Sequence, residues 1–320
     1  MPPVDRNNPK RSKASESTYS LMEFMREFPD DATCLEWLWR NRYSEDGEHA
    51  YCPHCEKERS FKRYATKQQR QSWTCTGCGH HLQPTAGTIF HKSSTSLQLW
   101  FYAMYIMAST RCGVSAKQLE RELGVTYKTA WRMFNLIRNQ LMSQDGDKPL
   151  SGSVEADETW IGGKLRESER RRLNPDGKSS GPYVKKRETV FGMVERGGRA
   201  KATIVPSRYG YTLRSQIREG VELGSTIYTD DYYGYNGVEL VYAHHRINHS
   251  ARVYVSGDIH TQTIEGFFGL VKNGLRGVYH SVSAKWLQGY LNEYAWRYNR
   301  RDNGRAMFLD LLSESVSRAR

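Results

Sequence analysis

The sequence predicts an α/β protein built from several modules. The amino-terminal half combines helical patterns with two closely spaced cysteine pairs, and short strand-like runs separated by glycine-containing turns dominate from residue 152 onward. A chain of 320 residues is also too long for one small core, and it suits a large domain with smaller modules beside it.

The composition favours a polyanionic partner. The formal net charge is +12 and the isoelectric point is about 9.4, a surplus that attracts nucleic acid and anionic membranes alike. The longest apolar stretch, near residues 97–108, is too short to cross a bilayer. The first residues, Met-Pro-Pro-Val-Asp-Arg, contain no apolar signal core, so we expect a cytoplasmic protein.

The chain begins with the features of a basic arm and two short helices. Residues 1–18 are polar and basic and have no periodicity, which predicts a flexible arm. A helical segment is expected at 19–46. Apolar residues at helical spacing form its first helix, which Pro29 ends, and a second helix is expected over residues 31–42.

The most specific local pattern is a pair of CxxC motifs within residues 47–92. Two such knuckles are typical of a zinc ribbon, in which four thiolates converge on one Zn²⁺ ion. The expected ligands are Cys52, Cys55, Cys75 and Cys78. The zinc can hold the fold alone, or the basic hairpin between the knuckles can contact DNA as well. Cys34 and Cys112 stand outside the pattern, and we expect both to be buried thiols.

Residues 95–145 predict a helix-turn-helix DNA-binding domain. Ser115 can cap a first helix that a glycine turn ends, and Thr126 can cap the second helix. On the second helix Lys128 and Arg132 point the same way, opposite an apolar face, so they are candidates for contact with DNA. A capped helix pair is also common in ordinary helical domains, and that alternative stays open.

Residues 150–320 predict the largest domain, with a basic insertion near 164–188 that contains few apolar residues. Its elements are expected to form a hairpin meander, a helix, two short strands and two further helices. The strands are predicted at 153–161, 189–195, 200–205, 225–229 and 238–245, and the helices at 212–221, 263–275 and 284–300.

Three acidic residues of this domain suit metal-bound carboxylates. Asp157 and Asp230 close strand-like runs, and Glu265 opens a helix-like run. Two strand-borne aspartates and a helix-borne glutamate are what an RNase H-like fold uses to hold two divalent metal ions for phosphodiester chemistry. We prefer Asp230 to its neighbour Asp231 because the strand ends where Asp230 begins.

Periodicity places further charged residues beside these carboxylates. Glu155 shares a strand face with Asp157, and we expect a bound cation to ease the negative charge of that face. On the helix, Lys272 and Arg276 share a face with Glu265, where their charges would let a phosphate backbone approach. Lys272 and Arg276 are therefore candidates for contact with DNA.

With these motifs the chain resembles bacterial insertion-sequence transposases that carry an amino-terminal zinc ribbon and a DDE catalytic domain, relatives of the eukaryotic Merlin elements. The resemblance runs from about residue 28 to residue 301. The matching segments are 52–55, 154–163, 228–230, 260–280 and 294–301. The resemblance implies that Asp157, Asp230 and Glu265 are the catalytic acids of an RNase H-like domain.

It also implies an enzyme that binds double-stranded DNA at the ends of a mobile element, cleaves the backbone and joins the 3′ ends to target DNA. Metal chemistry predicts that Asp157 bridges two ions while Asp230 and Glu265 hold one each, with Mg²⁺ preferred and Mn²⁺ as a substitute. We expect a homodimer or higher oligomer on DNA, associated with the nucleoid. Two alternatives stay open: a non-catalytic DNA-binding regulator on the same scaffold, and a nuclease of the same fold that cuts without joining.

Overall fold

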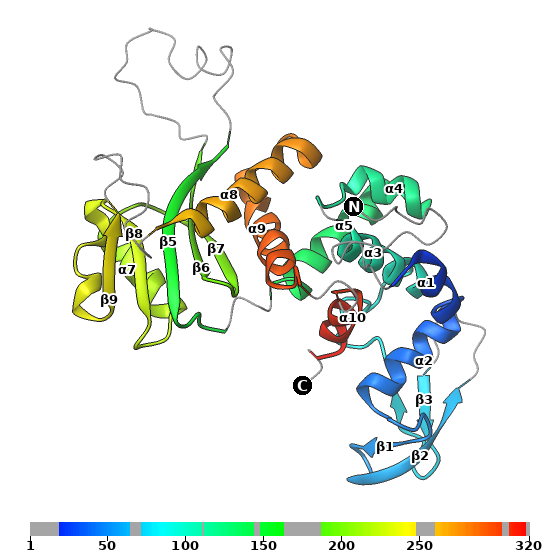
Figure 1. Ribbon diagram of the computed structural model, residues 1–320. Helices are drawn as coiled ribbons and strands as arrows, with labels where there is room; N and C mark the ends of the chain where they lie inside the picture. Colours follow the sequence, from blue (N-terminus) through cyan, green and yellow to red (C-terminus); the bar gives the residue numbers. More distant parts are fainter. Residues whose placement is uncertain are drawn as a thin grey trace, which may run out of the picture. The chain divides into compact units, whose positions relative to one another are not determined.

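The computed structural model describes residues 19–64, 72–110, 112–143, 148–162, 187–247, 260–302 and 307–317 (Figure 1). The chain divides into two compact units: unit 1 comprises Met1–Leu141 with Asp302–Arg320, and unit 2 comprises Met142–Arg301. The expected basic arm and nearly all of the expected insertion near 164–188 lie outside the described residues. None of the described helices has the length and apolar character needed to span a membrane.

Unit 1 contains a helical layer that aromatic side chains hold together. Its helices include α1 (Leu21–Glu27), α2 (Asp31–Arg42), α3 (Leu97–Ser109) and α10 (Met307–Ser317). The ring of Phe24 lies 5.7 Å from that of Phe28 and 5.6 Å from that of Phe308, and Phe28 meets Phe101 at 5.1 Å. All four rings are buried, so these phenylalanines form the core between α1, α3 and α10.

Helix α10 packs in unit 1, although it follows unit 2 in the chain. It contacts α2 and α3 through a stripe of buried side chains that includes Phe308, Leu311 and Leu312. The domain boundaries expected from the sequence placed residues 302–320 with the catalytic domain. The structure differs because this apolar stripe finds its complementary face on α3 rather than on the sheet of unit 2.

A four-stranded antiparallel sheet follows α2 within unit 1. Its strands, in the order β1-β2-β3-β4, are β1 (His49–Cys52), β2 (Lys57–Tyr64), β3 (Ser72–Cys75) and β4 (His81–Leu82). Trp73 of β3 stacks on Trp39 of α2 with ring centroids 4.8 Å apart and planes 7° apart. The indole N–H of Trp39 donates to the carbonyl of Gly47 at 2.8 Å. These contacts anchor the small sheet to α2.

Two capped helices joined by a glycine turn complete unit 1. Ser115 Oγ accepts the N–H of Gln118 at 3.1 Å, and Thr126 Oγ1 accepts the N–H of Thr129 at 3.4 Å, as the capping pattern predicts. Gly124 between them has a φ of 63°, the left-handed conformation that ends the first helix. The second helix continues directly into a π-helical turn. These elements are α4 (Ala116–Leu123), α5 (Tyr127–Leu136) and η2 (Ile137–Leu141).

Unit 2 is built on a five-stranded mixed sheet. Its strands are β5 (Ser153–Ile161), β6 (Glu188–Glu195), β7 (Ala200–Val205), β8 (Thr226–Asp230) and β9 (Ala243–Ile247). The order is β7-β6-β5-β8-β9. The first three strands form an antiparallel meander, and β8 and β9 add in parallel to β5. This order with these directions is an RNase H-like core, as the sequence predicts.

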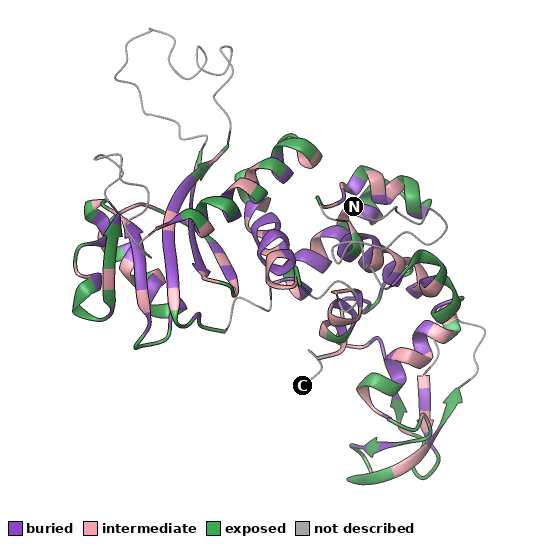
Figure 2. Cartoon of the chain, in the orientation of Figure 1, coloured by how far each residue is buried: buried purple, intermediate pink, exposed green. Residues whose placement is uncertain are grey.

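Helices cover both faces of this sheet. They are α7 (Gly210–Gly220), α8 (Gln262–Gly274) and α9 (Ala284–Asn299). On β6, Met193 faces α7, where a Cβ on Gly220 would collide with its methyl group. The next residue back, Gly192, faces α8, where a Cβ would lie 2.7 Å from the ring of Phe268. Strand alternation therefore puts α7 and α8 on opposite faces, and the strands between them are largely buried (Figure 2).

The strand predicted at 238–245 is wrong in its bounds. Val238–Leu240 forms a 3₁₀ turn, and β9 covers Ala243–Ile247 instead. The apolar residues Val238 and Tyr242 join the core cluster beside α7, which explains their strand-like appearance in the sequence. Only Ile247 of β9 is buried, so pairing with β8, rather than an apolar pattern, makes this strand.

Gly274→Ala should destabilise unit 2, whereas Gly269→Ala should not, although both glycines lie in α8. A Cβ on Gly274 would collide with the hydroxyl of the buried Tyr294 of α9, and a Cβ on Gly269 would meet nothing within 4 Å. Helix propensity favours alanine by up to about 1 kcal/mol at either position. Overpacking costs about 1–3 kcal/mol at the first alone. The unfolding temperature should therefore fall for Gly274→Ala and stay the same or rise for Gly269→Ala. Equal shifts in the two variants would contradict the close contact between α8 and α9.

Candidate active site and cysteine centre

Asp157 and Asp230 lie on one face of the sheet, on neighbouring parallel strands. Glu155 of β5 pairs with Tyr228 of β8, so two residues further along each strand Asp157 and Asp230 lie level with one another. Asp157 also pairs with Gly192, which α8 covers. Both aspartates therefore face α8. Both are half-buried. Asp230 is the last residue of β8, whereas Asp157 lies at the middle of β5 and not at its end, where the sequence had suggested it.

Helix α8 brings Glu265 to the same face and is tied to β5 by Glu155. The N-cap residue of α8 makes no capping bond with its own side chain. Instead the carboxylate of Glu155 accepts the N–H groups of Thr263 at 2.8 Å and Ile264 at 3.0 Å. These amides lack partners within the helix and attract negative charge. One strand thus carries Asp157 and also fixes the start of the helix that carries Glu265.

The charge of Glu155 is met by protein groups. Its side chain is fully buried, Arg196 Nε donates to Oε1 at 2.8 Å, and His260 Nδ1 lies 3.1 Å from the same oxygen. The cation expected at this face is therefore not needed at Glu155, because Arg196 and the start of α8 meet the charge of that residue. His249, which precedes this helix in the chain, lies outside the described residues.

Burial and neighbouring carboxylates both raise the pKa values of the two aspartates. Burial, followed by the charges of Glu158, Asp230 and Glu265, raises the pKa of Asp157 from 3.8 to about 7, although the N–H of Glu158 opposes this. Burial also raises the pKa of Asp230, whose Oδ1 accepts the N–H of Tyr232 at 3.1 Å. Oxygen donors with uncompensated negative charge fit Mg²⁺ or Mn²⁺.

Glu265 is exposed. Among the described residues, the four cysteines are the only group of His, Cys, Asp or Glu side chains gathered closely enough to hold a metal ion as they stand. Asp231, which follows Asp230, is exposed. A half-buried pair of aspartates with an exposed glutamate opposite them leaves one side of the site open. Phosphodiester chemistry requires such an opening, because a DNA backbone must reach the ligands.

Glu158 forms a second buried carboxylate site on the opposite face of β5. It pairs across the sheet with Phe191, which faces α7. Arg208 Nε donates to Glu158 Oε1 at 2.6 Å, and the buried hydroxyl of Tyr235 donates to the other oxygen. Strand alternation thus separates Glu158 from the face of Asp157, but its charge still raises the pKa of Asp157. Sequence reasoning found neither Arg208 nor Arg196 as partners, because each lies far from its glutamate in the chain.

Glu155→Gln should lower the turnover of any metal-dependent reaction at this site by about ten- to a hundred-fold, because it loosens the helix that carries Glu265. The amide keeps the size of the side chain but loses the charge that pairs with Arg196 and with the start of α8. The Mg²⁺ concentration needed for half-maximal activity should rise as well. Kinetics at varied Mg²⁺ measure both effects.

Glu195→Gln is the matched control, since Glu195 is a strand-borne glutamate of the same sheet that pairs with Arg199 and lies away from α8. Its metal requirement should equal that of the unchanged protein. If Glu155→Gln lost stability but kept its metal requirement and turnover, Glu155 would be a structural residue only.

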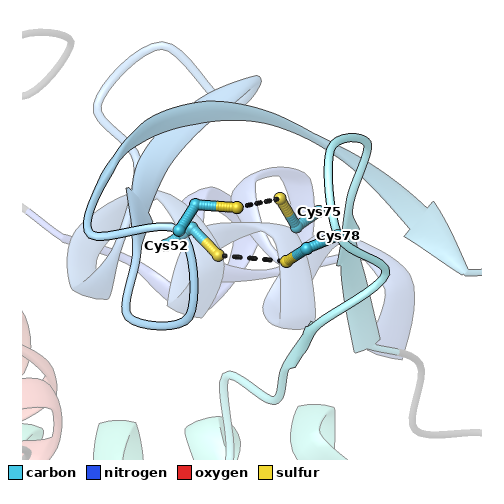
Figure 3. Close-up of side chains that lie close together, drawn as sticks. Cys52, Cys75 and Cys78 are labelled. Carbon is cyan, nitrogen blue, oxygen red and sulfur yellow. Dashed lines mark hydrogen bonds between the residues drawn. The ribbon is translucent and has the colours of Figure 1, made fainter.

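The four predicted zinc ligands converge between two turns of the small sheet (Figure 3). The Sγ atoms of Cys52 and Cys78 are 3.6 Å apart, those of Cys55 and Cys75 are 4.0 Å apart, and all four lie within 4.8 Å of one another. Tetrahedral Zn²⁺ with bonds of about 2.3 Å places sulfurs about 3.8 Å apart. The cysteine cluster therefore fits a structural zinc ion.

The two remaining cysteines differ in environment. Cys34 of α2 is buried, as expected. Cys112 is exposed, so the expectation that it is a buried thiol is wrong. It lies in a turn between α3 and α4.

The basic candidates lie on open faces. Lys128 and Arg132 of α5 are exposed. The opposite side of that helix is buried through Ala130, Met133, Phe134 and Ile137. On α8, Lys272 is half-buried with Nζ 5.9 Å from the ring of Phe268, and Arg276, in the π-helical turn that follows, is exposed. The faces expected from periodicity are thus present on both helices.

Comparisons with known proteins identify the family of this chain. A family model for the ISXO2-like transposase domain matches residues 149–299. A transposase-like protein of Haemophilus influenzae is 30% identical over 97 residues, which cover 30% of this chain and 77% of that protein. The chain belongs to the ISXO2-like DDE transposases. The resemblance drawn from the motifs is thereby confirmed, and the ISXO2-like domain spans the sheet and helices of unit 2 that carry Asp157, Asp230 and Glu265.

A second relative covers most of this ISXO2-like chain. A protein in transposable element ISH50 of Halobacterium salinarum is 28% identical over 270 residues, 81% of this chain and 86% of that protein. Two solved Mos1 assemblies are also similar. The pre-cleavage transpososome shares 12% identity with a TM-score of 0.26 over 64% of this chain and 74% of that chain. The strand transfer complex shares 11% with a TM-score of 0.29 over 69% and 78%, and we infer nothing from likeness this low.

Proposed function

We propose that this chain is an active transposase that cleaves DNA at the ends of a mobile element and joins the 3′ ends to target DNA. The observation that carries the proposal is the shared face of Asp157, Asp230 and the start of α8. Strand register sets the two aspartates level, and Glu155 ties the helix of Glu265 to the same strand. Membership of the ISXO2-like family supports the same reading.

In this proposal Asp157, Asp230 and Glu265 would together hold the catalytic metal ions. Bound Mg²⁺ or Mn²⁺ would activate the attacking oxygen, from water and later from a 3′-hydroxyl, and stabilise the leaving oxygen. The N–H groups of Glu158 and Tyr232 hold the two aspartates in place. Glu265 is exposed and can adjust its rotamer toward the aspartates when the ions and DNA bind.

The proposal assigns DNA binding to modules outside the carboxylates. The helix pair within 95–145 would act as a helix-turn-helix and read the element end through Lys128 and Arg132. Lys272 and Arg276, on or just after the helix of Glu265, would hold the backbone near the metal ions. The zinc ribbon within 47–92 would add basic contacts, and a dimer or larger oligomer would bring two element ends together.

The test is a cleavage and joining assay on labelled DNA taken from beside the coding region. The unchanged protein with Mg²⁺ should release a 3′ end and transfer it to a second DNA, and chelation of the metal should stop both steps. Cutting without transfer would favour a nuclease of the same fold. Binding without cutting at any divalent metal would favour a non-catalytic regulator.

The helix pair can be tested separately by binding alone. Lys128→Ala and Arg132→Ala should weaken binding to the element end more than to random DNA, by about 1–3 kcal/mol for each side chain that reads a base. Affinity should also fall steeply with salt, because basic side chains displace condensed counterions. Equal weakening on both DNAs would limit Lys128 and Arg132 to backbone contacts.

A further inference from the structure

Five aromatic residues gather around the end of the sheet that carries the aspartates. We define the aromatic cluster as Trp160, Tyr209, Tyr211, Tyr232 and Tyr233. Four of these side chains are largely exposed, at 47% for Trp160, 63% for Tyr209, 67% for Tyr211 and 68% for Tyr233. They come from the end of β5, the start of α7 and the turn after β8 (Figure 1). Large rings exposed together usually mark a binding surface.

Arg208 organises this aromatic cluster. Its guanidinium lies 4.8 Å from the ring centre of Trp160 and 4.1 Å from that of Tyr232. Arg208 Nε also donates a hydrogen bond to Oε1 of the buried Glu158 carboxylate at 2.6 Å, which fixes the position of the guanidinium. The hydroxyl of Tyr232 donates to the Arg208 carbonyl at 3.2 Å. The rings are therefore held by an ion pair and a hydrogen bond, which makes them a defined surface.

Close backbone packing places the remaining tyrosines in the same cluster. A Cβ on Gly210 would lie 2.8 Å from the carbonyl oxygen of Gly234, so the start of α7 lies directly against the turn after β8. Tyr209 and Tyr211 flank this contact from α7 and stack with ring centroids 6.1 Å apart. Tyr233 flanks it from the turn and lies 4.5 Å from the ring of Tyr232.

The aromatic cluster borders the candidate active site. Trp160 follows Asp157 on β5 by three residues and so faces α7, opposite Asp157, whereas the N–H of Tyr232 donates to Asp230 Oδ1 at 3.1 Å. A strand of DNA held at Asp230 that continues past the end of the sheet toward α7 would therefore have its neighbouring nucleotides beside these rings.

We propose that the aromatic cluster binds unpaired bases of the DNA strand next to the cleaved phosphate, an inference that rests on the proposed function. Bases stack on aromatic side chains and on arginine with little regard to sequence. In a duplex the faces of the bases are covered by their neighbours, so these rings take nucleotides only where the DNA is open. The cluster thus selects for a melted or single-stranded flank at the site of reaction.

The experiment measures binding in the presence of a chelator, so that chemistry plays no part. The probe is an oligonucleotide duplex with a short unpaired flank that contains the fluorescent base 2-aminopurine, and the reference is the same duplex fully paired. The unchanged protein should prefer the flanked duplex and quench its fluorescence. In the double variant Tyr209→Leu with Tyr211→Leu, affinity for the flanked duplex should fall roughly five- to a hundred-fold for each stacked base. Its affinity for the fully paired duplex should not change.

The double variant Tyr209→Phe with Tyr211→Phe is the matched control, because it keeps both rings and should keep both the preference and the quenching. No preference of the unchanged protein for the flanked duplex would overturn the inference, as would equal weakening in the Leu and Phe variants. Cleavage by the unchanged protein is scored separately. If the unchanged protein cleaves DNA but shows no stacking, the inference alone is refuted. If it shows stacking but does not cleave, the proposed function is refuted.

Discussion

Asp157→Ala, Asp230→Ala and Glu265→Ala should each lower DNA cleavage and joining by more than roughly a thousand-fold, or about 4 kcal/mol of transition-state stabilisation. Each change removes a proposed ligand of the metal ions. Binding of the element end should remain largely intact, because the basic side chains proposed to hold DNA lie elsewhere, on α5, in the last turn of α8 and just after α8. Gel shift and cleavage assays on the same labelled DNA measure both effects.

Asp231→Asn is the matched control for strand register, because Asp231 is exposed and follows the strand. It should cleave nearly normally. If Asp231→Asn were inactive while Asp230→Asn still cleaved DNA, the strand register assigned to β8 would be wrong. Glu158→Gln is a poorer control, since Glu158 is buried against Arg208 and Tyr235.

Asp157→Asn separates lost chemistry from lost folding. Because the pKa of Asp157 is raised from 3.8 to about 7, ionising it costs the folded protein stability, and that cost grows as pH rises between these two values. The asparagine variant carries no such charge, so without metal above pH 7 it should unfold at a temperature equal to or higher than the unchanged protein. If Asp157→Asn were inactive and also less stable than the unchanged protein, its loss of activity would be explained by impaired folding.

Cys75→Ser should remove one zinc ion per chain and unfold the small sheet of β1 to β4. The four sulfurs lie within 4.8 Å of one another, and binding of structural zinc contributes on the order of 10–16 kcal/mol in small zinc modules. A sheet of this size has little other core, although Trp73 stacks on Trp39. Metal analysis and limited proteolysis of the purified protein measure the loss.

Cys112→Ser is the matched control, because Cys112 is exposed and lies outside the cysteine cluster. It should keep full zinc occupancy and a protected sheet. Full occupancy in Cys75→Ser, or an equal loss in both variants, would refute the zinc assignment.

Much of the fold could be predicted from the sequence because its elements carry local signals. β5 and β7 have the bounds that alternation and turn residues predict, and α2 ends where its apolar pattern ends. Elements whose formation depends on distant partners could not be predicted. Helix α10 is placed by its contact with α3, and β9 is a strand because β8 offers it a partner.

The candidate site divides along the same line. Asp157, Asp230 and Glu265 could be identified from the chain, since Asp157 lies within a recognisable strand, Asp230 at a strand end and Glu265 near a helix start. The buried partner of the helix could not, because Glu155 meets Thr263 and Ile264 only across the fold. Alternation placed Glu155 correctly beside Asp157, but only the fold shows that α8 and Arg196, rather than a cation, receive its charge.

The central claim is that Asp157, Asp230 and Glu265 form one metal centre on DNA. Anomalous diffraction from crystals of the protein with element-end DNA and Mn²⁺ tests it most directly. The account predicts two manganese peaks about 3.5–4 Å apart, with Asp157 contacting both and Asp230 and Glu265 contacting one each. Manganese bound elsewhere, or ions that leave Glu265 without a contact while DNA occupies the site, would contradict it.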